Sequence, residues 1–234
     1  MKKTLALTLT IFVLSFVTGA DAQFGKMATP RFHSDFMPTV GGWSEYQITT
    51  KGESPSKMKI AIVEKEGDAY WYETVFEGKQ DGRIISKMLV SGNPEDQKNV
   101  KRMIFKTGNE PAMEMPVQMR RQGRQSAESK GKMIDKGEET IKVPAGTFKT
   151  QHLQYQDGEK IVDSWVYKDI FPYGMVKSQS EDFEMVLIGH GMGAKTQITE
   201  TPRRFEMPKM DRRGMQKAPR PEKGKPKGEE EDNE

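Results

Sequence analysis

The side chains best suited to chemistry in this chain of 234 residues are its methionines and histidines. There are 16 methionines, three histidines and no cysteine. Thioether sulfur is a soft ligand that favours Cu(I), so Met113, Met115 and Met119 could form a copper site together with His190. These residues form no compact repeat, however, and methionine also fills irregular cores and adaptable apolar surfaces. We therefore predict no metal site and no cofactor, and keep copper handling as an alternative.

No set of residues in the sequence predicts a catalytic site. His33, His152 and His190 have neither a paired cysteine nor the spacing of a zinc motif. The glycine-rich stretch 189–195 lacks the strand–loop–helix context of a phosphate-binding loop, and a turn or bulge explains it better. The acids at 181–182 fall in a predicted turn, where acids are common for local reasons. We therefore expect a protein that is not an enzyme.

The elements that carry these residues are predicted to be strands of an antiparallel sheet. Apolar and polar residues alternate with period two in short runs, and Asp-Gly pairs such as Asp81–Gly82 and Asp157–Gly158 separate them as hairpin turns. Runs spaced at about 8–12 residues favour an all-β sandwich or barrel over a parallel sheet. We expect strands over 43–49, 58–63, 69–77, 84–90, 133–143, 147–156, 160–167, 175–180, 183–188 and 194–199.

One helix is expected among these strands. Asn93 can cap a helix, Pro94 suits its first position, and Glu95 suits its first turn. Val100, Met103 and Ile104 then follow at helical spacing, which predicts a helix over 94–107 lying across the sheet. The segment 110–124 is expected to be a loop or a short helix. The predicted fold class is mainly β (α+β), a curved antiparallel half-barrel of about 8–11 strands covered by one or two helices.

The first 22 residues are predicted to be a signal peptide. A basic start at Lys2 and Lys3 precedes an apolar run over 5–17, and Ala20–Asp21–Ala22 fits the small-x-small cleavage pattern. A signal anchor is the alternative, but the apolar run falls short of the roughly 20 residues that span a bilayer. Without a cysteine for lipid attachment, the chain is expected to be periplasmic or secreted as a soluble protein after cleavage near Ala22.

Two further segments flank the predicted half-barrel domain, which covers 42–201. Residues 23–41 are expected to be a flexible lead-in, whose Phe24, Phe32 and Phe36 could dock on the domain or on a partner. Residues 202–234 form a charged tail with no apolar period, which predicts disorder. The basic part of the tail could touch an anionic membrane surface.

Charge excludes one class of partner. The formal net charge is +3, with 37 basic and 34 acidic residues intermixed. A dedicated nucleic-acid binder would show a stripe of one sign, so no specific nucleic acid is expected. No pattern in the sequence predicts an oligomeric state.

Three stretches in the second half resemble a known family. They are Val-Pro-Ala-Gly-Thr-Phe at 143–148, the Trp165–Val166 strand, and Phe-Pro-Tyr-Gly-Met-Val-Lys at 171–177. Their order resembles that in the C-terminal half of uncharacterised small secreted bacterial domains. Expected export without a lipid anchor, a first strand led by Trp43 and a hairpin-rich chain with an intervening helix resemble the periplasmic lipoprotein-carrier (LolA/LolB-like) superfamily, whose general shape those domains share. The resemblance implies an incomplete, curved β-barrel closed by helices around an apolar cavity that holds acyl chains.

The resemblance and the sheet together predict a binding function. A curved half-barrel has one concave face, and a helix laid over it can leave a pocket. We predict a soluble periplasmic binding protein that holds a lipid, a lipoprotein acyl chain or another apolar ligand. The alternatives are a Met-rich copper-handling protein and an envelope adaptor that acts through its basic tail. The candidates to line the cavity, which could instead simply form the core, are Trp43, Tyr70, Tyr72, Phe76, Met88, Phe148, Trp165 and Met185.

Overall fold

The computed structural model describes residues 32, 34–79, 82–118 and 131–205. The predicted signal peptide, Phe24, Met119 and the tail beyond residue 205 lie outside the described residues. Within the described part of the chain, no helix has both the length and the apolar character needed to cross a membrane.

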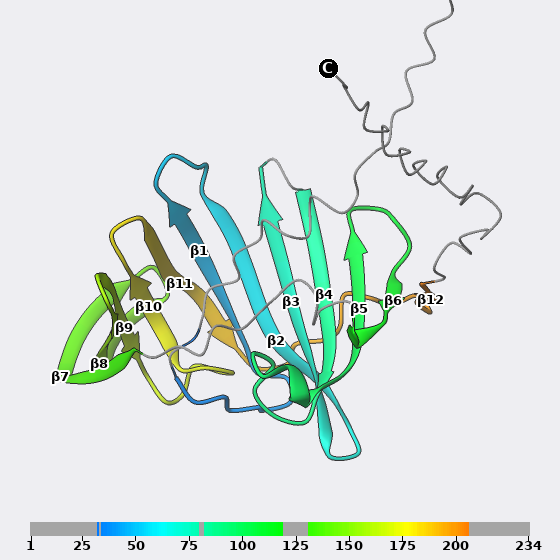
Figure 1. Ribbon diagram of the computed structural model, residues 1–234, viewed down its shortest axis with the longest axis horizontal. Coiled ribbons are helices and arrows are strands. Elements are labelled where there is room, and N and C mark those ends of the chain that lie inside the picture. The colour runs from blue at the N-terminus through cyan, green and yellow to red at the C-terminus, as the bar shows by residue number, and fades with distance from the viewer. Residues whose placement is uncertain (1–31, 33, 80–81, 119–130, 206–234) are drawn as a thin grey trace, which may run out of the picture.

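The described residues form one open, curved, twelve-stranded sheet, with β7 at one end and β12 at the other (Figure 1). Neighbouring strands are antiparallel except β12 and β6, which are parallel. The strands lie in the order β12-β6-β5-β4-β3-β2-β1-β11-β10-β9-β8-β7. This confirms the predicted class of a mainly β, curved antiparallel fold. The strands are β1 (Trp43–Thr50), β2 (Ser56–Glu66), β3 (Ala69–Gly78), β4 (Gly82–Val90), β5 (Val100–Thr107), β6 (Met113–Met115), β7 (Lys132–Val143), β8 (Gly146–Asp157), β9 (Lys160–Val166), β10 (Met175–Gln179), β11 (Phe183–Gly191) and β12 (Arg203–Arg204).

The helix expected over 94–107 is wrong. Asn93 does accept a hydrogen bond from the Glu95 N–H, but this bond forms only a turn. The 3₁₀ turn η2 (Gln97–Asn99) that follows is capped by Asp96. The chain then enters β5 and pairs with β4. Met103 and Ile104 are both buried, and they belong to core clusters on opposite faces of the sheet. A strand buries both side chains and satisfies the β4 edge, which outweighs the local helical spacing.

Period-two alternation divides the core into two clusters. The inner face carries the larger cluster, which reaches from β5 to the β7–β8 hairpin and includes Tyr46, Tyr72, Met88 and Met185. The outer face carries a smaller cluster around Trp71 on β3, β4 and β5. Both faces of this sheet are therefore apolar, and both need cover from outside the sheet.

The strand expected over 194–199 is also wrong, because this segment crosses the outer face without joining the sheet. It is held by the buried carboxylate of Glu73, which accepts hydrogen bonds from the Thr196 hydroxyl at 2.6 Å and the Gln197 N–H at 3.0 Å. Ile198 packs in the outer cluster. The apolar residue Ile198, which suggested a strand, instead covers the outer face of the sheet.

The same segment is fixed a second time at Glu200. Its carboxylate pairs with the Lys106 ammonium on β5 and accepts a hydrogen bond from the Ala112 N–H at 3.3 Å. The hydrogen bond from Lys106, followed by backbone hydrogen bonds, lowers the pKa of Glu200 to about 2. Beyond this anchor the chain forms β12 against β6, a pairing of two short strands that the sequence analysis missed.

The Glu73 contacts predict a stability difference within one strand. Glu73→Gln should lower the free energy of unfolding by about 1–2 kcal/mol, because a buried acceptor loses its charge-assisted hydrogen bonds. Glu77→Gln on the same strand is the matched control, since Glu77 pairs with Arg83 at the exposed surface. Its effect should stay below about 0.5 kcal/mol. Urea denaturation measures both, and equal effects would contradict the anchoring role of Glu73.

Glu200 predicts a pH dependence. A carboxyl whose pKa is lowered on folding contributes stability that is fully present above its unfolded pKa of about 4.5 and is lost as pH falls toward 2. Glu200→Gln should therefore be less stable than the unchanged chain at pH 7. The difference between the two should shrink between about pH 5 and 2. Thermal unfolding of both proteins across this range checks the sign, and a difference that grows with acid would refute it.

Candidate functional site on the inner face

Three tyrosines form an aromatic floor on the inner face. Tyr46 comes from β1, Tyr72 from β3, and Tyr173 from the turn between β9 and β10. The Tyr46 hydroxyl donates to the Met175 carbonyl at 3.0 Å, which ties β1 to β10 across the intervening β11. Tyr173 and Tyr72 meet edge to face, with ring centroids 6.3 Å apart. The floor therefore joins the two halves of the sheet.

A tight turn brings Tyr173 over the sheet. The Gly174 N–H donates to Ile170 and the Tyr167 N–H donates to the Gly174 carbonyl. Gly174 has φ of 70°, and an added Cβ would lie 3.2 Å from the Tyr167 carbonyl oxygen, so glycine is required here. The Pro-Tyr-Gly stretch singled out in the sequence is thus a positioning device for one aromatic ring.

The floor carries no charge at neutral pH. Burial is the main cause that raises the pKa of Tyr46 and of Tyr173 well above the ordinary value for a phenol. Both side chains therefore stay neutral, and the face offers rings and hydroxyl groups. Such a surface suits apolar and aromatic groups, which gain from area burial and from ring contacts.

The lead-in covers this floor with two phenylalanines. The Phe32 ring stacks on Tyr173, with centroids 4.2 Å apart and planes 2° apart, and lies 6.3 Å from Tyr46. The Phe36 ring lies 5.5 Å from Tyr173 and 6.1 Å from Tyr72. Phe32 is buried, so the described part of the lead-in docks on the domain, the first of the two sites considered for it.

Polar contacts hold the same stretch in place. The Phe32 N–H donates to a Glu95 carboxylate oxygen at 2.9 Å. The Ser34 hydroxyl donates to the Tyr173 carbonyl at 2.6 Å, and the Met37 N–H donates to the Pro172 carbonyl at 2.7 Å. Phe32 and residues 34–37, which are the described residues up to Met37, are hereafter called the lead-in stretch.

The structure brings six of the eight predicted cavity residues together. They lie in the inner core cluster or pack against it, and they are Tyr70, Tyr72, Phe76, Met88, Phe148 and Met185. Tyr72, Met88 and Met185 are buried. Their role in ligand binding stays a prediction.

The two predicted tryptophans lie on the outer face. Trp43 lies beneath the Lys59 ammonium at 4.2 Å and against Gly191. Trp165 is opposite Lys177 in the register of β9 and β10. Strand parity explains this placement, because side chains an odd number of positions apart along a strand point to opposite faces. Trp43 is thus separated from Tyr46.

The methionine and histidine alternative is not assembled in the described structure. Met113 and Met115 are on β6, whereas His190 is on β11 beside Phe148. Six neighbour steps separate β6 from β11, which is roughly 28 Å measured along the sheet. Among the residues that the structure describes, no group of three or more histidines, aspartates and glutamates could hold a metal ion.

Two pockets lie away from the aromatic floor. The larger, of about 530 Å³, opens at β5, β6 and β12, and the smaller, of about 120 Å³, lies on the outer face around Lys57, Lys59 and Glu77. None of the predicted cavity residues lines either pocket. The larger pocket is lined by Val100, Lys101, Arg102, Glu114, Met115, Pro116, Val117, Gln118, Arg204 and Phe205.

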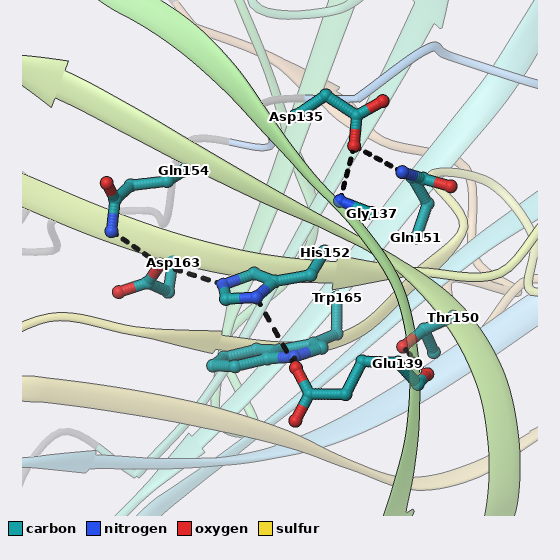
Figure 2. A network of polar contacts seen from close by, with 9 residues as sticks. All are labelled: Asp135, Gly137, Glu139, Thr150, Gln151, His152, Gln154, Asp163 and Trp165. Atoms are coloured by element: carbon teal, nitrogen blue, oxygen red, sulfur yellow. Dashed lines mark hydrogen bonds and ion pairs between the residues drawn. The ribbon is translucent and has the colours of Figure 1, made fainter.

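A polar cluster on β7, β8 and β9 was missed by the sequence analysis (Figure 2). His152 lies between two carboxylates, with Nε2 2.8 Å from Asp163 and Nδ1 3.3 Å from Glu139. Its ring stacks on Trp165 at 4.5 Å, and the Trp165 Nε1 donates to Glu139 at 2.7 Å. Gln154 also donates to Asp163.

The signal for this cluster was present in the sequence. Counting outward from the Asp157–Gly158 turn places His152 opposite Trp165 and Gln154 opposite Asp163. Opposite residues in a hairpin share a face and touch. The contacts match acids with donors, so the cluster stabilises the β7–β9 segment.

The cluster predicts a stability effect. His152→Ala should lower the free energy of unfolding by about 1–2 kcal/mol, because two carboxylates lose their shared partner and the Trp165 stack is lost. Adding Asp163→Asn should recover part of the loss by removing one charge. Lys149→Ala, on the same strand and in an exposed ion pair, should change stability by about 0.5 kcal/mol or less. Chemical denaturation compares the three, and a His152 effect equal to that of Lys149 would rule out the cluster's role.

Comparison with known proteins finds solved structures of low similarity to this chain. No protein-family model matches the chain, and no curated protein does. MucB, in its crystal structure with MucA(peri), is 12% identical with a TM-score of 0.42; the match covers 70% of this chain and 54% of MucB, about half its length. A Bacteroides fragilis protein described as exported, with a YmcC-like fold, is 11% identical with a TM-score of 0.35, over 68% of this chain and 99% of its own. A Parabacteroides distasonis protein described as a lipoprotein is 14% identical with a TM-score of 0.35, over 69% and 100%.

Proposed function

We propose that this chain is an exported, non-enzymatic binding protein whose inner face holds an apolar ligand, such as a lipid or a lipoprotein acyl chain. The observation that carries the proposal is the nature of the cover on that face. The neutral aromatic floor of Tyr46, Tyr72 and Tyr173 is covered by Phe32 and Phe36 of the lead-in stretch, whose described residues belong to neither the sheet nor a helix.

The free energies of apolar burial indicate that a ligand could displace the lead-in stretch from the floor. Full burial of two phenylalanine side chains contributes about 3–6 kcal/mol. An acyl chain of about a dozen methylene groups offers roughly 10 kcal/mol of apolar transfer before the costs of association. A ligand of that size can therefore compete with the stretch for the same surface. The rest of the domain stays intact, because the sheet carries its own backbone hydrogen bonds.

Two further features support the proposal. The first 22 residues have the pattern of an export signal, which would place the domain where lipids and lipoproteins are handled. The titratable groups of the floor are phenols, and burial raises the pKa of two of them, Tyr46 and Tyr173, so these two stay uncharged at neutral pH. Neutral rings suit storage of an apolar ligand better than proton transfer, which needs a pKa near the working pH.

Removing the two rings should open the face. In the full chain, Phe32→Ala together with Phe36→Ala should bind a fluorescent fatty acid at least about tenfold more tightly than the unchanged protein, because at least about 1.4 kcal/mol of competition from the two rings is removed. The matched control is Val40→Ala, since Val40 lies in the same lead-in but is 46% exposed. Its affinity should not change. Fluorescence titration measures the affinities, and native mass spectrometry of protein purified from its own cell envelope tests for a retained lipid. Absence of both probe binding and retained lipid would refute the proposal.

A further inference from the structure

The contacts of the lead-in stretch are those of a bound peptide. Two backbone N–H groups, from Phe32 and Met37, donate to acceptors on the domain. The Ser34 hydroxyl donates to a third acceptor, the Tyr173 carbonyl. The stretch contributes no strand to the sheet, so its hold on the domain depends on these bonds and on its two rings.

We infer that the inner face recognises polypeptide, and that the lead-in stretch is its internal ligand. The inference rests on the proposed function, because it takes the inner face as the binding site. The partner it identifies is a segment of another protein with two phenylalanines four residues apart and a hydroxyl residue midway, Phe-x-Ser-x-Phe. Such a segment would occupy the face when the chain's own stretch leaves it.

The geometry explains why the hydroxyl residue belongs to the pattern. Fully extended residues four apart are roughly 13 Å from each other. Yet the rings of Phe32 and Phe36 both lie within 5.5 Å of the Tyr173 ring, measured between centroids. The chain bends at Ser34, where the hydroxyl bonds to the backbone of the same tyrosine. One tyrosine thus sets the spacing of two rings and the bend between them.

The polar contacts distinguish polypeptide from lipid. An acyl chain can replace the two rings but offers no donor to Glu95, to the Pro172 carbonyl or to the Tyr173 carbonyl. A peptide supplies all three donors, and partly buried acceptors that lose their donors lose affinity. Tyr173 contributes both its ring and its carbonyl, so the turn that positions this residue also positions the peptide.

The lead-in stretch is covalently joined to the domain, and the test must take this into account. A segment joined to the domain by a short linker has an effective concentration in the millimolar range, so a free peptide competes poorly against it. The internal ligand must be weakened before binding from outside can be seen. The doubly substituted full chain, Phe32→Ala with Phe36→Ala, removes the rings and leaves the acceptors of the domain in place.

The experiment measures a synthetic peptide with the sequence of residues 29–41 against this variant, by fluorescence anisotropy. We expect binding at least tenfold tighter to the variant than to the unchanged chain. A peptide with both phenylalanines changed to alanine should not bind, and one with serine changed to valine should bind several-fold more weakly. Glu95→Gln in the variant should also weaken the peptide while leaving the affinity for the fatty-acid probe unchanged.

The outcomes separate the two proposals. Fatty-acid binding without peptide binding overturns the inference and leaves the proposed function standing. Equal peptide binding to the variant and the unchanged chain also overturns it, because the site would then lie elsewhere. Peptide binding that the fatty acid displaces supports both. If circular dichroism shows that the double variant is unfolded, Phe36→Ala alone takes its place, since Phe36 is only partly buried.

Discussion

A single open sheet with two apolar faces is the constraint on which the rest of this structure depends. In a sandwich, a second sheet would cover one of them; here the sheet is one layer, with core clusters on both faces. Each face is covered by a segment from outside the central strands. The lead-in lies on the inner face, and the segment around Ile198 lies on the outer face.

The two covers are held with different strength, and this difference suggests which face is available to a ligand. The outer cover is fixed by the buried Glu73, by the Glu200–Lys106 ion pair and by β12. The outer cover therefore continues into β12, which pairs with β6 at the edge of the sheet. Among the residues that the structure describes, the inner cover contributes two rings and three hydrogen bonds, and no strand. Displacing it leaves the sheet unbroken, whereas displacing the outer cover would unpair an edge.

What the sequence predicted well was set by local chemistry. Hairpins with Asp-Gly turns and period-two runs lie where expected, because turn type and alternation are properties of neighbouring residues. The same counting from the turn at 157–158 would have found the contact of His152 with Trp165. The helix over 94–107 failed because its cap signals at Asn93 are local, while the pairing of β5 with β4 depends on the whole sheet. Local signals could not reveal which partner the segment would find.

On the inner face, too, local sequence signals did not reveal the long-range contacts. Of the three floor tyrosines, only Tyr72 was among the predicted cavity residues, and Tyr46 and Tyr173 were missed. The sequence also gives no local reason for Phe32 to stack on a tyrosine 141 positions away. That contact exists because the 170–174 turn lifts Tyr173 over the sheet, and because Glu95 sits where it can accept the Phe32 N–H. Both supports lie in loops beside the sheet, at Pro-Tyr-Gly and at Asn-Pro-Glu. Loops whose carbonyl and carboxylate groups face a bound segment can select among segments, whereas apolar strands select mainly for size and shape. If the inner face binds a ligand as proposed, its two loops would set the specificity of binding and its strands the size of ligand that fits.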